Sequence, residues 1–193
     1  MKKKFFLVLI IVVLFLLVGF IYIYSKDNLK FKFEYEIYNN ISYDNGKKIK
    51  AKIPFDNKIV YVKEKDLESI ITSGNKVIYF GYTTCPWCRN IVSPLVEVIN
   101  DNNIDKLYYV DVHSDNTKGI YDILDEYLEF DYDCNKRLYV PDVYFIKDGK
   151  IVYHHLGSVD SYKDAFKGMN DKQLNELKNI YQEGIDLILG KEE

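Results

Sequence analysis

An uninterrupted apolar run near the amino terminus constrains this 193-residue chain more than any other feature. Residues Phe5 to Tyr24 comprise nineteen apolar side chains and one glycine, without a charge among them. Because an α-helix rises about 1.5 Å per residue, about twenty residues cross the roughly 30 Å hydrocarbon core of a bilayer. The run therefore predicts one transmembrane helix over residues 5–24, within an N-terminal signal anchor that comprises residues 1–25.

The alternative for this run is a cleaved signal peptide, whose apolar region usually has about 7–15 residues and ends in small residues. The run here is longer, and Tyr22 to Lys26 provides no small-residue cleavage site. No cysteine follows the run, so a lipid anchor is not expected either. We expect an uncleaved anchor whose Tyr22 and Tyr24 lie at the membrane interface.

Lysines on the two sides of the run bear on its orientation. Three lysines at positions 2–4 precede it together with the amino terminus, and three at positions 26, 30 and 32 follow it. Positive charges are retained on the cytoplasmic side, and the compact terminal cluster favours an amino terminus inside the cell. We therefore expect a single-pass cell-membrane protein whose C-terminal domain is extracytoplasmic.

Charge and cysteine content narrow the function of the rest of the chain. The chain after residue 25 contains 23 basic and 29 acidic side chains, so its net charge is −6. Nucleic-acid binding needs a basic surface that neutralises phosphates, so nucleic acid is not an expected partner. Three cysteines are also too few for a small scaffold held together by disulfides.

Residues 26–57 are polar, charged and rich in tyrosine. Two stretches, residues 31–37 and 49–53, alternate apolar and polar side chains as half-buried strands do. Asn45-Gly46 between them is a turn signal. We expect either a β-hairpin or a semi-ordered juxtamembrane stalk over residues 26–57.

From residue 58 onward, short apolar runs alternate with amphipathic stretches of helical period. We predict strands over residues 58–62, 77–82, 106–112, 143–146 and 151–154, and helices over residues 66–72, 86–100, 120–128 and 172–189. Asp148-Gly149 marks a two-residue hairpin turn between the last two strands. The order β-α-β-α-β-α-β-β-α predicts an α/β fold for residues 58–190.

The sequence Cys85-Pro86-Trp87-Cys88 directly follows the strand 77–82 and begins the next helix. Cysteines three apart on a helical turn are close enough to form a disulfide, and proline suits the first helical position. The N-terminus of a helix stabilises a thiolate through its unpaired N–H groups and its dipole. Because Arg89 adds a positive charge nearby, we predict a lowered pKa for Cys85.

Two other interpretations of the cysteine pair are a structural zinc site and a pair of inert buried thiols. A structural zinc site needs about four ligands, and neither Cys134 nor the histidines provide a second pair at standard spacing. His154 and His155 are adjacent on a predicted strand and therefore point to opposite faces. The place between a strand and a helix favours a redox dithiol. We expect no metal and no cofactor beyond a Cys85–Cys88 disulfide.

Two segments of the chain resemble the thioredoxin superfamily. Residues 79–89, YFGYTTCPWCR, look like its active-site segment, and residues 140–150, VPDVYFIKDGK, look like its cis-proline loop and the hairpin that follows. The resemblance covers residues 58–190 and implies a thioredoxin-like fold, a central mixed sheet flanked by helices. With its anchor and stalk, the whole chain resembles membrane-tethered thioredoxin-like proteins of Gram-positive bacteria, some of which are labelled bacteriocin-transport accessory proteins.

The resemblance also implies the roles of individual residues. Cys85 matches the attacking cysteine and Cys88 the resolving cysteine, with Pro86-Trp87 as the active-site loop between them. Pro141 matches the cis-proline that lies against the disulfide. Val140 precedes it with a backbone that is able to pair with a substrate strand.

Two positions depart from the family pattern. Thioredoxins proper carry a buried aspartate in the strand before the motif, which helps proton transfer to the resolving cysteine, and this chain has Tyr79 there. The proline that kinks the following helix falls one position late, at Pro94. The first departure bears on efficient reduction of disulfides and leaves the expected fold unchanged.

The implied activity is that of a thiol–disulfide oxidoreductase that acts on cysteine-containing protein substrates and needs a separate redox partner. The alternative is a redox-inactive accessory module that binds peptides at the Pro141 loop or joins a transporter. A metal-carrying CxxC protein is a third possibility. Cys134 is either an incidental free thiol or a regulatory or second resolving one.

Overall fold

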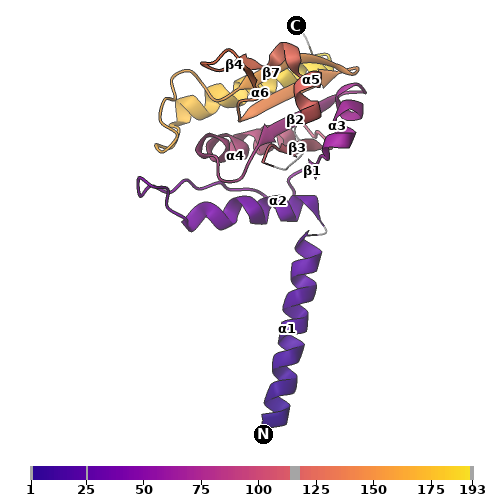
Figure 1. The fold of residues 1–193 in the computed structure, drawn as a ribbon, viewed down its shortest axis with the longest axis vertical. Coiled ribbons are helices and arrows are strands. Elements are labelled where there is room, and N and C mark those ends of the chain that lie inside the picture. Colours follow the sequence, from indigo (N-terminus) through magenta and orange to yellow (C-terminus); the bar gives the residue numbers. More distant parts are fainter. Residues whose placement is uncertain (1, 25, 114–117, 192–193) are drawn as a thin grey trace.

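The computed structural model describes residues 2–24, 26–113 and 118–191 of the chain (Figure 1). Its first helix, α1 (Lys2–Tyr24), projects as a rod from the rest of the molecule. Residues Phe5–Tyr22 of this helix are long and apolar enough to cross a membrane, and none of them is buried. The side chains of Lys2–Lys4 and Tyr24, on which the orientation and interface predictions depend, lie outside the described part of the chain.

A five-stranded mixed sheet forms the centre of the molecule. Its strands, in spatial order, are β1 (Ile59–Tyr61), β3 (Leu107–Asp111), β2 (Lys76–Gly81), β6 (Asp142–Lys147) and β7 (Lys150–Leu156). The first three are parallel to one another, and β6 is antiparallel to both β2 and β7. The five predicted strands are confirmed to within about two residues at each end.

Helices cover both faces of this sheet. On one face lie α2 (Asp27–Glu36), α4 (Pro86–Asp101) and α6 (Asp171–Leu189), and on the other lie α3 (Glu64–Ile71) and α5 (Lys118–Ile123). Successive residues of the central strand β2 point to opposite faces, so Tyr79 packs with the first group of helices and Phe80 with the second. Both side chains are fully buried, as the prediction of a strand covered on both faces requires.

Residues 27–36 form the helix α2, so the strand that the hairpin alternative placed over residues 31–37 is wrong. Phe31 and Tyr35 are four residues apart, so a helix places both on one face, and both are fully buried in the core. Phe33 and Ile37, the other two apolar residues of the pattern, are 39% and 52% exposed. A helix therefore satisfies the same alternation with one apolar pair inward and the other outward.

The second predicted strand of that hairpin, residues 49–53, pairs with side chains instead of with a strand. The Ala51 backbone exchanges two hydrogen bonds with the side-chain amide of Asn39, at 2.8 and 2.9 Å. The Ile53 N–H donates to Glu36 Oε1 at 2.9 Å. Residues 27–57 thus pack against the sheet domain, and the start of an independent domain at residue 58 stays a prediction.

The chain between β3 and β6 also differs from the prediction. The helix expected over residues 120–128 is shorter, and a small hairpin of β4 (Glu129–Phe130) and β5 (Lys136–Arg137) follows it. The Asp131 carboxylate organises this hairpin, because it accepts hydrogen bonds from two backbone N–H groups of the turn and from Arg137 Nε at 2.8 Å. Cys134 lies exposed in the turn, with a φ of 59°.

Candidate active site

The cysteine pair lies where β2 leads into α4. Cys85 is the N-cap of α4 and Pro86 occupies the first helical position, in agreement with the prediction. The Cys85 sulfur accepts a hydrogen bond from the Cys88 N–H at 3.3 Å, so a sulfur performs the capping role that an oxygen usually fills. Both cysteines are free thiols, Cys85 with 3% exposure and Cys88 fully buried.

Hydrogen bonds lower the pKa of Cys85 to about 7. The Cys88 thiol contributes most, and it is opposed by burial of the Cys85 sulfur. The backbone N–H groups of Cys88 and Trp87 and the Tyr82 hydroxyl lower the pKa further. This direction agrees with the expectation for a thiol at a helix N-terminus.

The second cysteine has the opposite character. Burial raises the pKa of Cys88 well above its ordinary value, and the hydrogen bond to Cys85 and the charge on that sulfur raise it further. Near neutral pH a large fraction of Cys85 is therefore thiolate, whereas Cys88 remains a thiol. This arrangement provides one sulfur that is ready to attack and one that keeps its proton.

Arg89 has a different role from the predicted one. Its side chain is 1% exposed, and its guanidinium binds neutral oxygen atoms. The five hydrogen bonds run from Nε to Ile49 O (3.2 Å), from Nη1 to Tyr35 O (2.7 Å) and Thr83 O (2.9 Å), and from Nη2 to Ile49 O (3.0 Å) and Asn39 Oδ1 (2.6 Å). All five N–H donors are thus used. Arg89 therefore binds the segment of residues 35–49 to the start of α4, where the cysteine motif lies. Arg89 is not among the main groups that lower the Cys85 pKa.

The Val140–Pro141 peptide bond is cis, as the resemblance implies. Strand β6 is antiparallel to β2, and its first residue, Asp142, pairs with Phe80. The start of β6 and the end of β2 therefore lie at the same edge of the sheet, from which the chain runs on to Cys85. Pro141 is buried, and Val140 packs against the clusters on both faces of the sheet.

Aromatic contacts flank the motif on two sides. Trp87 packs edge-on against Tyr162, with ring centroids 5.5 Å apart. Tyr82 stacks on His113, with centroids 3.9 Å apart. Such contacts restrict ring orientation, so they hold Tyr82 and Trp87, which are close to the cysteines in sequence, in place.

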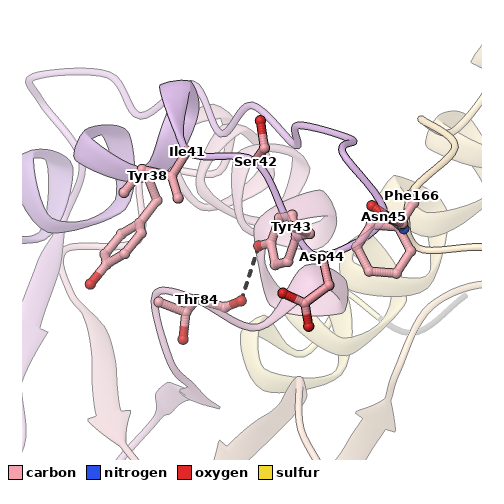
Figure 2. A pocket seen from close by; sticks show the side chains of 8 residues that line it. All are labelled: Tyr38, Ile41, Ser42, Tyr43, Asp44, Asn45, Thr84 and Phe166. Atoms are coloured by element: carbon pink, nitrogen blue, oxygen red, sulfur yellow. Dashed lines mark hydrogen bonds between the residues drawn. The ribbon is translucent and has the colours of Figure 1, made fainter.

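A cavity of about 490 Å³ lies beside the motif (Figure 2). It is lined by Tyr38, Ile41, Ser42, Tyr43, Asp44, Asn45, Thr84 and Phe166. Figure 2 shows the Tyr43 hydroxyl directed at the backbone of Thr84, the residue before Cys85, and the hydrogen bond to its carbonyl is 3.0 Å long. The segment that was expected to be a hairpin or a semi-ordered stalk therefore lines a cavity next to Thr84, the residue before Cys85.

The remaining candidate residues lie apart from this centre. His154 Nδ1 is 3.3 Å from Asp142 Oδ1, whereas the His155 ring lies 6.0 Å from that of Tyr181, so the two histidines point to opposite faces as predicted. Within the described ranges, no group of three or more histidine, cysteine or acidic side chains is placed to hold a metal ion. Cys134 is exposed on the β4–β5 turn.

Three residues of the site could not be assigned from the sequence. The alternation over residues 31–37 is typical of a strand at Tyr35, no local pattern marks Tyr43, and the sequence indicates an electrostatic effect for Arg89 but no anchoring role. The signal that was available is the four-residue spacing of Phe31 and Tyr35, which fits one face of a helix. The contacts of Tyr43 and Arg89 depend on long-range packing that no local pattern encodes.

Comparison with known proteins bears on the fold alone. No protein-family model and no curated protein matches the chain. Solved structures that resemble it include thioredoxin O2 from Arabidopsis thaliana, with 20% identity over 66% of this chain and 94% of that one and a TM-score of 0.45. A thioredoxin from Trypanosoma brucei brucei is 17% identical over 67% of this chain and 93% of that one, with a TM-score of 0.45. Thioredoxin O1 from Arabidopsis thaliana is 22% identical over 65% of this chain and 99% of that one, with a TM-score of 0.41.

The topology itself defines the fold class. Three parallel strands and an antiparallel pair form the sheet in the order β1-β3-β2-β6-β7, the cysteine motif joins β2 to α4, and a cis-proline precedes β6. The chain therefore has a thioredoxin-like α/β fold, preceded by one apolar N-terminal helix.

Proposed function

We propose that this protein is a membrane-anchored thiol–disulfide oxidoreductase whose thioredoxin-like domain acts outside the cytoplasm on cysteine-containing protein substrates. The observation that carries the proposal is the unequal character of the two cysteines. Cys85 has a pKa of about 7 at the N-terminus of α4, and the buried Cys88 keeps its proton.

The chemistry is a two-step exchange of thiols and disulfides. The Cys85 thiolate attacks a substrate disulfide, forms a mixed disulfide and releases one substrate thiolate. Cys88 then loses its proton and attacks the Cys85 sulfur, which releases the second substrate thiolate and leaves the Cys85–Cys88 disulfide. Two electrons pass to the substrate, and the reverse sequence oxidises a substrate dithiol. A redox partner must restore the starting state in either direction.

The pKa of Cys85 suits both directions. An attacking thiol is most effective when its pKa lies near the ambient pH, because a lower value reduces its nucleophilicity and a higher value reduces its thiolate fraction. With a pKa of about 7, a large fraction of Cys85 is thiolate at neutral pH. The same low pKa makes Cys85 a good leaving group when Cys88 or a substrate thiolate attacks the disulfide.

Substrate binding is assigned to Val140 and Pro141. They lie at the sheet edge from which the chain runs to Cys85, and the resemblance implies that the Val140 backbone pairs with an extended substrate segment. In this position a substrate chain would pass the Cys85 sulfur while its backbone pairs along the loop.

The membrane location rests on α1. Its Phe5–Tyr22 segment is apolar and wholly exposed, as expected for a helix whose solvent is lipid. A signal sequence near an amino terminus has the same character, so retention of α1 in the mature protein is part of the proposal. The proposal follows the resemblance of the whole chain to membrane-tethered thioredoxin-like proteins of Gram-positive bacteria.

The test uses the full chain in detergent with Cys134→Ser, which removes the exposed thiol. Insulin supplies substrate disulfides, and reduced, unfolded ribonuclease supplies substrate thiols. We expect disulfide exchange with at least one of them, and a substrate mixed disulfide on Cys85 that accumulates in Cys88→Ala. The matched Cys85→Ala variant should accumulate none. Exchange with neither protein, and no trapped species in Cys88→Ala, would refute the enzymatic proposal and favour a redox-inactive accessory module.

A further inference from the structure

Helix α2 carries apolar side chains on two opposite faces. Phe31 and Tyr35 are fully buried in the core. Residues two positions away from them on an α-helix lie about half a turn further round, so they point away from the core. The apolar residues of this second stripe, which ends at the residue directly after α2, are Leu29, Phe33 and Ile37.

Phe55 extends this stripe into a larger apolar surface. It lies in the segment that leads from α2 back to the sheet, and it is 71% exposed, while Phe33 and Ile37 are 39% and 52% exposed. The stripe and Phe55 surround a hollow of about 300 Å³, which is lined by Leu29, Lys32, Phe33, Glu36, Ile37 and Phe55. We refer to its four apolar residues, 29, 33, 37 and 55, as the outer face of α2. Exposed apolar side chains that adjoin one another in this way mark a surface that binds something apolar.

The charged side chains of α2 are bonded within the protein. Its two lysines form ion pairs one turn along the helix, Lys30 with Glu34 at 3.9 Å and Lys32 with Glu36 at 2.7 Å. Asp27 accepts a hydrogen bond from a backbone N–H of β1 at 3.1 Å. The lysine stems can lie along apolar surface while their ammonium groups stay near water. The outer face of α2 therefore adjoins paired charges, and it presents no unpaired charge of this helix to an apolar partner.

The outer face of α2 lies next to the apolar helix α1. Helix α2 begins at Asp27, three residues after α1 ends at Tyr24, so at most about 10 Å of chain separates the two helices. Figure 1 shows α2 running across the end of α1, between α1 and the sheet. Because Phe31 and Tyr35 turn one face of α2 towards the sheet, the outer face is turned towards the side on which α1 projects. A bilayer that contains α1 would lie on that side.

We propose that the outer face of α2 lies in the surface of the bilayer that α1 spans, with its four apolar side chains between the lipid headgroups and the upper acyl chains. This inference rests on the proposed function, because it needs α1 as a retained membrane anchor. A helix in this position lies parallel to the membrane and buries its apolar side chains about 5–10 Å into the boundary between headgroups and chains. Because the charges of α2 are paired, the contact depends on apolar burial and needs no anionic lipid.

The size of the outer face favours a lipid surface over a second copy of the chain. Helix α2 has ten residues, so a stripe of its length and width covers about 150–200 Å². A stable protein interface buries about 800 Å² per partner, which is several times more. A lipid surface needs no such area, because the covalent link to α1 already holds α2 beside it at a high effective concentration.

The proposed contact would orient the active site relative to the membrane. The guanidinium of Arg89, the residue after Cys88, donates a hydrogen bond to the backbone carbonyl of Tyr35 in α2 at 2.7 Å. The inner face of α2 also packs into the core below the sheet through Phe31 and Tyr35. A helix α2 that lies in the bilayer surface therefore holds the cysteine motif at a fixed height, whereas α1 alone would leave the domain free to tilt.

The test measures the membrane depth of single tryptophans in the full chain, reconstituted in phosphatidylcholine vesicles. Trp87 is the only tryptophan in the sequence, so Trp87→Phe gives a parent without tryptophan fluorescence. Tryptophan is then introduced singly by Phe33→Trp and Phe55→Trp on the outer face of α2, by Phe15→Trp within α1, and by Tyr132→Trp on the β4–β5 turn. Phosphatidylcholine that carries a nitroxide, either near the headgroup or near the end of an acyl chain, quenches the fluorescence of a tryptophan at its own depth.

The four variants should differ in a defined way. The fluorescence of Phe33→Trp and Phe55→Trp should fall about twofold or more, and most with the nitroxide near the headgroup. Phe15→Trp should be quenched most by the nitroxide near the chain end, because residue 15 lies midway along the apolar segment. Tyr132→Trp is the matched control. Tyr132 is a fully exposed aromatic residue directly after β4, which Figure 1 shows on the side of the molecule away from α2, so its variant should keep its fluorescence.

The possible failures are distinguishable. A Phe15→Trp protein that no nitroxide lipid quenches refutes the membrane anchor, and the inference with it. If Phe15→Trp is quenched but Phe33→Trp and Phe55→Trp are quenched no more than Tyr132→Trp, the anchor stands and the position of α2 is refuted. Equal quenching of Tyr132→Trp and the outer-face variants would show general adsorption of the domain and would also refute it.

Two further outcomes also decide. If Phe55→Trp emission shifts with protein concentration and no nitroxide lipid quenches it, a second copy covers the outer face and the inference is wrong. If Phe33→Trp does not fold, Phe55→Trp decides, because Phe55 is 71% exposed and contributes little to the core. Thiol–disulfide exchange with insulin and ribonuclease is measured separately in the chain that retains Trp87, so a failure of the enzymatic proposal is recognised independently.

Discussion

Replacement of Arg89 by methionine tests whether this side chain holds residues 35–49 against the active site, as its hydrogen bonds indicate. Methionine keeps most of the apolar stem and removes the guanidinium with its five hydrogen bonds. The backbone carbonyls of Tyr35, Ile49 and Thr83 and the side chain of Asn39 each lose a donor. The variant therefore removes one side chain and weakens the contact of three chain segments.

The size of the effect follows from two opposing contributions. Each hydrogen bond to a charged group contributes about 1.5–3 kcal/mol, but burial of a guanidinium costs several kcal/mol, and the variant relieves that cost. Four oxygen atoms lose a donor, and each buried acceptor left unsatisfied costs about 1–3 kcal/mol, so we expect a net destabilisation of about 3–5 kcal/mol. For a chain of this size each kcal/mol lowers the unfolding temperature by about 2–4 °C, so a decrease on the order of 10 °C is expected.

The assay is thermal unfolding in detergent, with limited proteolysis to locate the loosened segment. Arg137→Met is the matched control, because its guanidinium makes a 2.8 Å ion pair with Asp131 at the surface and is 56% exposed. Surface pairs of this kind contribute little, so this variant should unfold with the parent. Arg89→Met should also become sensitive to proteases within residues 38–53. An Arg89→Met protein that unfolds with the parent and resists proteolysis there would refute this account of Arg89.

Three further predictions concern the core, the pH dependence and the membrane. Gly81→Ala should lower the free energy of unfolding, measured by urea denaturation, by about 1–3 kcal/mol, because the added Cβ would clash with the Tyr79 ring. Gly168→Ala is the control, because no atom lies within 4 Å of its added Cβ, and it should not change that free energy. Equal effects of the two substitutions would contradict this packing. Folding lowers the Cys85 pKa to about 7, so the reduced protein should gain stability over Cys85→Ser as the pH rises above about 7 and lose that gain as the pH falls through it. Mass spectrometry of the membrane fraction should find the mature chain with residues 5–24 retained, and a mature N-terminus beyond residue 25 would contradict the anchor.

The sheet and the cysteine motif were predictable because their signals are local. The apolar run of β2, the dipeptide at 148–149 and the proline within Cys85–Cys88 each determine their own backbone geometry. The register, which pairs Asp142 with Phe80, was not predicted, and the resemblance implied only that Pro141 lies against the disulfide. The fold class could therefore be obtained without the structure.

The errors arise where one pattern fits two structures. The alternation over residues 31–37 suits a strand, yet Phe31 and Tyr35 also lie on one face of a helix, and packing against Tyr109 selects the helix. The two-residue strands β4 and β5 are too short to show any period. The anchoring role of Arg89 was not predictable, because its position next to Cys88 in sequence does not determine which acceptors its long side chain reaches.

The central claim is that Cys85 is a nucleophile at neutral pH and Cys88 is not. The direct measurement is the rate of iodoacetamide alkylation of each cysteine as a function of pH, resolved by peptide mass spectrometry of the reduced protein. The account predicts that alkylation of Cys85 rises with a midpoint near pH 7, while Cys88 stays unmodified until well above pH 9. A Cys85 midpoint near that of an ordinary thiol, or modification of both cysteines together, would contradict it.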